Sequence, residues 1–78
     1  MIANKTVLHL TTNCNCIYSI YAAEMGAKKV YCVINGHGEI EQKNKYMMEE
    51  IIKENQWQHV ITVLFFRHFN EQVDVIIG

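Results

Sequence analysis

Apolar residues gather in short runs along this chain, and polar or glycine-containing segments separate the runs. The runs at residues 5–10 (KTVLHL), 29–34 (KVYCVI), 59–66 (HVITVLFF) and 72–77 (QVDVII) are rich in β-branched residues, which is typical of strands. The first run is apolar at successive positions, so its strand should be buried on both faces.

Two further segments have the apolar spacing of helices. Residues 17–25 (IYSIYAAEM) predict a short helix, and Gly26 follows where a left-handed residue commonly ends one. Residues 40–55 predict a longer helix, because apolar positions recur there every three or four residues. Its charged side places opposite charges four residues apart, Glu41 with Lys45 and Glu49 with Lys53, which predicts ion pairs.

The order of these elements, β-α-β-α-β-β, predicts an α/β fold. Strands that alternate with helices favour right-handed crossovers and a mostly parallel four-stranded sheet with helices on its faces. The last connection, residues 67–71, is too short for a usual parallel crossover. Either a helix is lost there or the fourth strand pairs antiparallel. No linker or repeat divides the chain, so residues 1–78 should form a single unit.

Composition and charge exclude several classes of function. Half of the 78 residues are apolar, the formal net charge is −1, and the lysines and acids are interleaved, so we expect neither nucleic acid nor membrane as a partner. The N-terminus lacks the layout of a signal peptide, and the three cysteines are an odd number. We therefore expect reduced thiols and a cytoplasmic or nuclear location.

The candidate binding residues lie where the first two strands end. Ligands of open α/β sheets bind at the carboxyl ends of the strands, and nucleotide-type loops there use glycines and an acidic residue. Here the loop after the first strand has no glycine and the second strand ends without an acid. The residues available to bind a cofactor are Thr11, Thr12, Asn13, Cys14 and Asn35.

Three segments resemble protein arginine methyltransferases. These are residues 7–34 (VLHL, then IYSIYAAEMGAKKVYCVI), residues 54–63 (ENQWQHVITV) and residues 71–78 (EQVDVIIG). In that family a VLD-type strand precedes a glycine-rich loop, and the second strand ends in a cofactor-binding glutamate. The resemblance implies the S-adenosylmethionine-binding half of a three-layer, Rossmann-like methyltransferase fold.

The departures from the family pattern fall where its chemistry lies. His9 stands at the position of the first-strand aspartate, and Ile34 stands at the position of the ribose-binding glutamate. The loss of one charge-assisted hydrogen bond weakens binding roughly tenfold to a hundredfold. The family's two substrate glutamates lie in a loop after the VDIIIS strand, beyond Gly78. The resemblance therefore implies weak or lost S-adenosylmethionine binding and no catalytic residue here.

These features favour a noncatalytic protein arginine methyltransferase-like domain that acts as a relic or scaffold, a pseudoenzyme. An apolar sheet with two helices leaves a face or edge uncovered, so we expect a protein partner or a homo-oligomer. One alternative is the S-adenosylmethionine-binding part of an active assembly. Another is a small metal-binding module, in which His9, Cys14, Cys16 and His37 would hold zinc.

Several other residues invite a functional reading but are expected to be structural. Cys32 lies inside an apolar strand, and Asp74 matches a family aspartate that we interpret as structural. The thiols of Cys14 and Cys16 lie near a helix N-terminus, which can lower a thiol pKa and make it nucleophilic. The methionines expected to pack against helices are Met25, Met47 and Met48.

Overall fold

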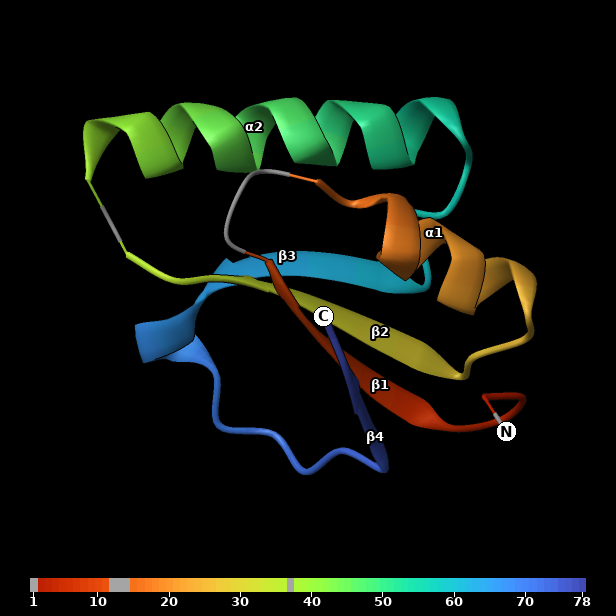
Figure 1. The fold of residues 1–78 in the computed structure, drawn as a ribbon. Coiled ribbons are helices and arrows are strands. Elements are labelled where there is room, and N and C mark those ends of the chain that lie inside the picture. Colours follow the sequence, from red (N-terminus) through yellow and green to blue (C-terminus); the bar gives the residue numbers. More distant parts are fainter. Residues whose placement is uncertain (1, 12–14, 37) are drawn as a thin grey trace.

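The computed structural model describes residues 2–11, 15–36 and 38–78. The elements follow the order β1 (Thr6–Thr11), α1 (Ile17–Glu24), β2 (Lys29–Ile34), α2 (Glu39–Glu54), β3 (Ile61–Phe65), a 3₁₀ turn η1 (Phe66–His68) and β4 (Val75–Ile77). Figure 1 shows this order from red to blue along the chain. The predicted alternation of strands and helices is confirmed.

The four strands form one parallel sheet in the order β3-β2-β1-β4. β1 pairs with β2 from Thr6 opposite Lys29 to Thr11 opposite Ile34. β4 pairs with the other side of β1, also parallel, so the antiparallel alternative for the fourth strand is wrong. The connection of residues 66–74 carries η1 in place of a crossover helix.

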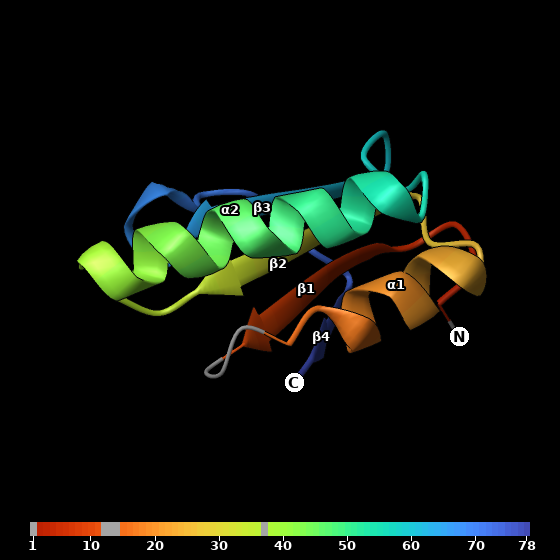
Figure 2. The ribbon, with the colours of Figure 1, turned by 90° about the horizontal axis from the view of Figure 1, so that it is seen from above.

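Both helices cover the same face of the sheet. Figures 1 and 2 show α2 over β2 and β3, α1 over the β1 side, and the connection of residues 66–74 crossing the opposite face. Handedness explains this division. The connections from β1 to β2 and from β2 to β3 run in the same direction across the sheet, whereas the connection from β3 to β4 runs in the opposite direction. Because all three crossovers are right-handed, the connection of residues 66–74 lies on the face opposite the two helices.

The hydrophobic core lies between the sheet and the two helices. Val7, Val30 and Met48 are completely buried there, and α1 contributes the small residues Ala22 and Ala23. Small residues at these positions let α1 lie close to the strands. The face crossed by residues 66–74 is less well covered, since Leu10 is 42% exposed and Ile76 is 64% exposed. The prediction that the first strand is buried on both faces is therefore wrong at Leu10.

The side-chain pairs of α2 differ from the two predicted ion pairs. Glu41 accepts a hydrogen bond from the Gly38 N–H at 2.8 Å, so it caps the start of α2. Lys45 pairs instead with Glu49, at 2.9 Å between Nζ and Oε2. At the end of α1, Gly26 adopts a φ of 92° and its N–H donates to the Ala23 carbonyl, as predicted for a helix-ending glycine.

The methionines divide between core and surface. Met48 packs in the core as expected, but Met25 is 60% exposed and Met47 is 51% exposed, so the packing prediction is wrong for these two. Cys32 is fully buried, which confirms its assignment to the core. Among the residues that the structure describes, no helix is long and apolar enough to cross a membrane.

Asp74 fixes the start of β4 against β1. Its carboxylate accepts a hydrogen bond from the Thr6 N–H at 3.0 Å, and its own N–H donates to the Thr6 carbonyl at 2.8 Å. These two bonds join residues 68 positions apart. The structural interpretation of Asp74 is confirmed.

Candidate functional site

The carboxyl ends of β1, β2 and β3 meet at one edge of the sheet, where open α/β folds bind ligands. A hollow of about 250 Å³ lies at this edge. Its described lining consists of Leu10, Thr11, Val33, Asn35 and Phe66. Three of these side chains are hydrocarbon, one is a hydroxyl and one is an amide, so the described lining carries no charge.

Only two of the five predicted cofactor residues lie in described parts of the lining. Thr11 is buried, and its hydroxyl lies 3.3 Å from both the N–H and the carbonyl oxygen of Asn15. It therefore joins the two ends of the β1–α1 loop. Asn35 is exposed at the rim of the hollow. Thr12, Asn13 and Cys14 lie outside the described residues.

The sequence reasoning missed three residues of this lining, Leu10, Val33 and Phe66. The alternation of side chains along a strand could have predicted two of them. Leu10 and Val33 are directly paired in neighbouring strands, so their side chains lie on the same face of the sheet. Phe66 is the first residue after β3 and is 56% exposed. Its position directly after the third strand could have placed it at the same edge.

Ile34 does not offer its side chain to this hollow. The residue is 5% exposed and belongs to the core cluster beneath the helices. A branched hydrocarbon at the end of β2 is stabilised by burial, whereas a carboxylate there would have to face a polar group or water. The position that the resemblance assigns to ribose binding therefore contributes to packing in this chain.

His9 forms a buried polar contact with α1. Its Nδ1 lies 2.7 Å from the Ser19 hydroxyl, and Cys32 Sγ lies 3.7 Å from the same nitrogen. Burial lowers the pKa of His9 below its usual value, so the ring is neutral at pH 7. Burial raises the pKa of Cys32 to about 11, while its hydrogen bond to Ser19 acts in the opposite direction. The cluster is thus a set of neutral groups that joins β1, α1 and β2.

The lowered pKa of His9 predicts a loss of stability in mild acid. In the unfolded chain His9 binds a proton below about pH 6.5, whereas in the folded chain it binds one only at lower pH. The free energy of unfolding therefore falls as the pH is lowered below about 6.5. The slope for one group is at most about 1.4 kcal/mol per pH unit. Urea unfolding between pH 5 and pH 8 measures it. His9→Gln should flatten the slope, whereas exposed His59→Gln should not; equal slopes in all three proteins would contradict the assignment.

The metal and thiol alternatives gain no support from the described residues. No group of three potential ligands is assembled in residues 2–11, 15–36 and 38–78, and both Cys14 and His37 lie outside them. Cys16 is buried, and burial raises its pKa, so the alternative of an acidic, nucleophilic thiol at the start of α1 is wrong for this residue, and its structural interpretation holds.

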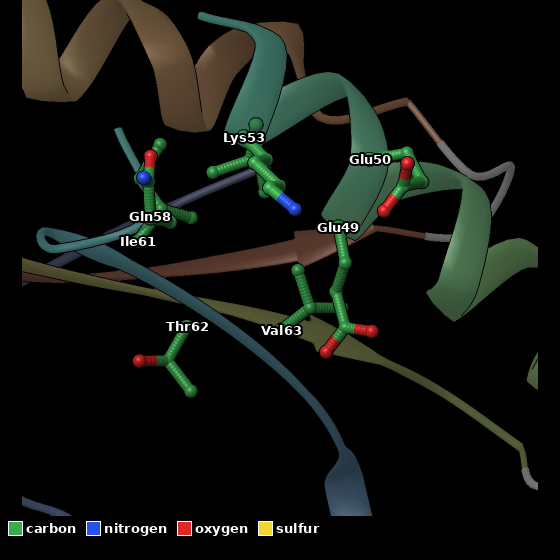
Figure 3. Close-up of a pocket in the computed structure, with 8 residues that line it drawn as sticks. Glu49, Glu50, Lys53, Gln58, Ile61, Thr62 and Val63 are labelled. Atoms are coloured by element: carbon green, nitrogen blue, oxygen red, sulfur yellow. The ribbon is translucent and has the colours of Figure 1, made fainter. Parts of the chain in front are cut away.

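Two of the larger hollows lie away from the carboxyl edge. One, of about 380 Å³, runs between α1 and β4 and has the apolar residues Tyr18, Tyr21, Met25 and Ile77 in its wall. The other, of about 320 Å³, lies between α2 and the edge strand β3, and Figure 3 shows its charged rim of Glu49, Glu50 and Lys53. Neither is placed where the fold binds cofactors.

Comparison with known proteins agrees with the fold. No family model matches the sequence, and no curated protein sequence is significantly similar to it. Among solved structures, protein arginine methyltransferase 10 of Arabidopsis thaliana, described in a uniquely open conformation, superposes with a TM-score of 0.75 at 30% identity. The Trypanosoma brucei PRMT1 enzyme-prozyme heterotetrameric complex with AdoHcy superposes with a TM-score of 0.68 at 28% identity.

These matches cover 96% of this chain but only 21% and 23% of the two methyltransferase chains. The resemblance inferred from residues 7–34, 54–63 and 71–78 is therefore confirmed, as is the methyltransferase-type α/β fold. The chain spans about a fifth of the length of these methyltransferases.

Proposed function

We propose that this chain, a half-domain similar to protein arginine methyltransferases, is noncatalytic on its own and acts as a scaffold for another protein chain. The observation that carries the proposal is that the described residues lining the hollow at the carboxyl edge carry no charge. Ile34 is turned into the core, and the hollow beside it is lined by hydrocarbon, one hydroxyl and one amide. A ribose held without a carboxylate loses a charge-assisted hydrogen bond worth about 1.5–3 kcal/mol.

The scaffold role is supported by the surfaces that the fold leaves open. The hollow between α1 and β4 is mostly apolar, and Ile76 of the edge strand β4 is 64% exposed. Exposed apolar surface of this kind commonly marks a protein interface. One structural neighbour forms an enzyme-prozyme heterotetrameric complex. We propose a methyltransferase chain as the partner at this side of the sheet.

Calorimetric titration with S-adenosylmethionine and S-adenosylhomocysteine tests the noncatalytic half of the proposal. The wild-type chain is expected to give no saturable binding at micromolar ligand, because Asn35 is the one exposed polar side chain among the described residues that line the hollow. Saturable micromolar binding would favour the alternative function, the cofactor-binding part of an active assembly. AdoHcy in the complex of one neighbour is the observation that keeps this alternative in view.

A charge added at the rim is expected to recover part of the lost affinity. Asn35→Asp replaces a neutral hydrogen-bonding group with a carboxylate, which should strengthen S-adenosylhomocysteine binding roughly fivefold to tenfold. NMR titration at millimolar ligand measures both dissociation constants. Asn70→Asp adds the same charge at an exposed residue outside the hollow and should change nothing. Equal gains in both variants would show that the hollow is not the binding site.

A further inference from the structure

Strand β3 is an edge strand without the usual protection of sheet edges. Its sequence, ITVLF, contains no charge, no proline and no glycine. In natural proteins, charged residues, proline or glycine usually protect an edge strand, because its unpaired peptide groups could otherwise pair with another chain. The opposite edge strand, β4, has three residues and therefore fewer peptide groups to offer.

The peptide groups of β3 that face outward can be identified from its pairing with β2. The Val30 N–H donates to the Val60 carbonyl at 3.0 Å, and alternate residues of a parallel strand bond the same neighbour. Residues 60, 62 and 64 therefore face β2, and the peptide groups of Ile61 and Val63 face the open edge. The Ile61 N–H turns back to the Trp57 carbonyl at 2.9 Å. The Val63 N–H and the Ile61 carbonyl are thus a donor and an acceptor two residues apart.

Three charged residues of α2, Glu49, Glu50 and Lys53, line the hollow above this edge, and Glu49 and Lys53 carry opposite charges. Figure 3 shows Glu49 descending towards Val63, and Lys53 one helical turn further on, nearer Ile61. Lys45 pairs with Glu49 on the other side, but this is an exposed pair of the kind that contributes little to stability. Glu49 can therefore interact with a second cation without losing its first.

We propose that β3 is the interface of a homodimer, in which it pairs antiparallel with β3 of a second copy about a two-fold axis at Thr62. The two sheets then join into one eight-stranded sheet. The Val63 N–H of each copy donates to the Ile61 carbonyl of the other, and the two Thr62 side chains face each other in a favourable cross-strand pair. This surface lies at the opposite end of the sheet from the one proposed to bind a methyltransferase chain and does not depend on the cofactor edge.

Charge complementarity identifies the occupant as a second copy and fixes the register. With the axis at Thr62, the midpoint between Glu49 and Lys53 lies near the axis, so Glu49 of each copy meets Lys53 of the other. A shift of the axis to Val63 would bring the two Glu49 carboxylates together, which disfavours that register. A surface that complements itself under a two-fold rotation is the requirement for a closed dimer.

Light scattering and sedimentation measure the expected dimer, whose mass is twice the 9.1 kDa of one chain. Thr62→Lys places two like charges opposite each other and should weaken association at least about tenfold. Ile76→Lys makes the same addition on the other edge strand and should leave the dimer intact. A monomeric wild-type chain, or a dimer that Ile76→Lys dissolves and Thr62→Lys does not, overturns the proposal.

Charge reversal tests the register itself. Glu49→Lys and Lys53→Glu should each weaken the homodimer, because each variant then presents like charges at the contact. Both residues are exposed, so neither change should unfold the chain. An equimolar mixture of the two variants should restore dimers of wild-type strength, since opposite charges face each other again. Failure of the mixture to associate more strongly than either variant overturns the assigned axis, whatever the cofactor titration gives.

Discussion

Met48→Ala is expected to destabilise the protein by about 3 kcal/mol, which is a large part of the total stability of a domain of this size. Met48 is fully buried and projects from α2 into the core above the sheet. Truncation removes its hydrocarbon from the core and leaves a cavity that the surrounding strands and helices cannot close completely. Urea unfolding followed by far-ultraviolet circular dichroism measures the loss.

Met47→Ala is the matched control for this prediction. The two methionines are neighbours in the same helix, so helix propensity changes equally, but Met47 is 51% exposed. Its replacement should change the free energy of unfolding by no more than about 0.5 kcal/mol. Similar losses in both variants would mean that α2 is rotated about its axis relative to the described packing.

Ile34→Glu is expected to be at least as destabilising, at about 4 kcal/mol, although it introduces the glutamate that the resemblance to protein arginine methyltransferases places at this position. The substitution removes a buried branched side chain and places a carboxylate among hydrocarbon groups. The difference from wild type should shrink as the pH is lowered towards 4, because burial raises the pKa of the new carboxyl and the protonated form is tolerated better.

Asn35→Glu serves as its control, because it adds the same carboxylate one residue later on the exposed rim. That variant should unfold within about 0.5 kcal/mol of wild type. If Ile34→Glu were as stable as Asn35→Glu, the side chain at position 34 could reach the hollow at the carboxyl edge. A single substitution would then supply the carboxylate that the described lining of this hollow lacks.

The element order could be predicted from the sequence because each run has a single dominant period. The run at residues 29–34 gives the strand β2 without error, and Gly26 marks the end of α1 correctly. The direction of β4 could not be predicted, since it depends on which neighbour the strand finds. The pairing of β4 with β1 is fixed by hydrogen bonds between Asp74 and Thr6, which are distant in sequence and meet only in the folded chain.

The chemistry of the site was predictable only in part. The glycine-free loop after the first strand and the lack of an acid at the end of the second strand were visible in the sequence, and Asn35 lines the hollow at this edge. The pairing of His9 with Ser19 was not predicted, because a histidine in an apolar strand gives no indication of which helix residue lies opposite. The partner of Glu41 was not predicted either. Its spacing from Lys45 suggested an ion pair, but its carboxylate accepts a hydrogen bond from the backbone N–H of Gly38 instead.

The pairing of β1 with β4 has a consequence for how the protein is made. β1 is a central strand, yet its second neighbour is formed by residues 75–77. During synthesis residues 75–77 must leave the ribosome before this side of β1 can be covered. Contacts of such long sequence separation also slow folding, because a large loop must close first. Newly made chains will thus expose one flank of β1 to chaperones until residues 75–77 have emerged and paired with it.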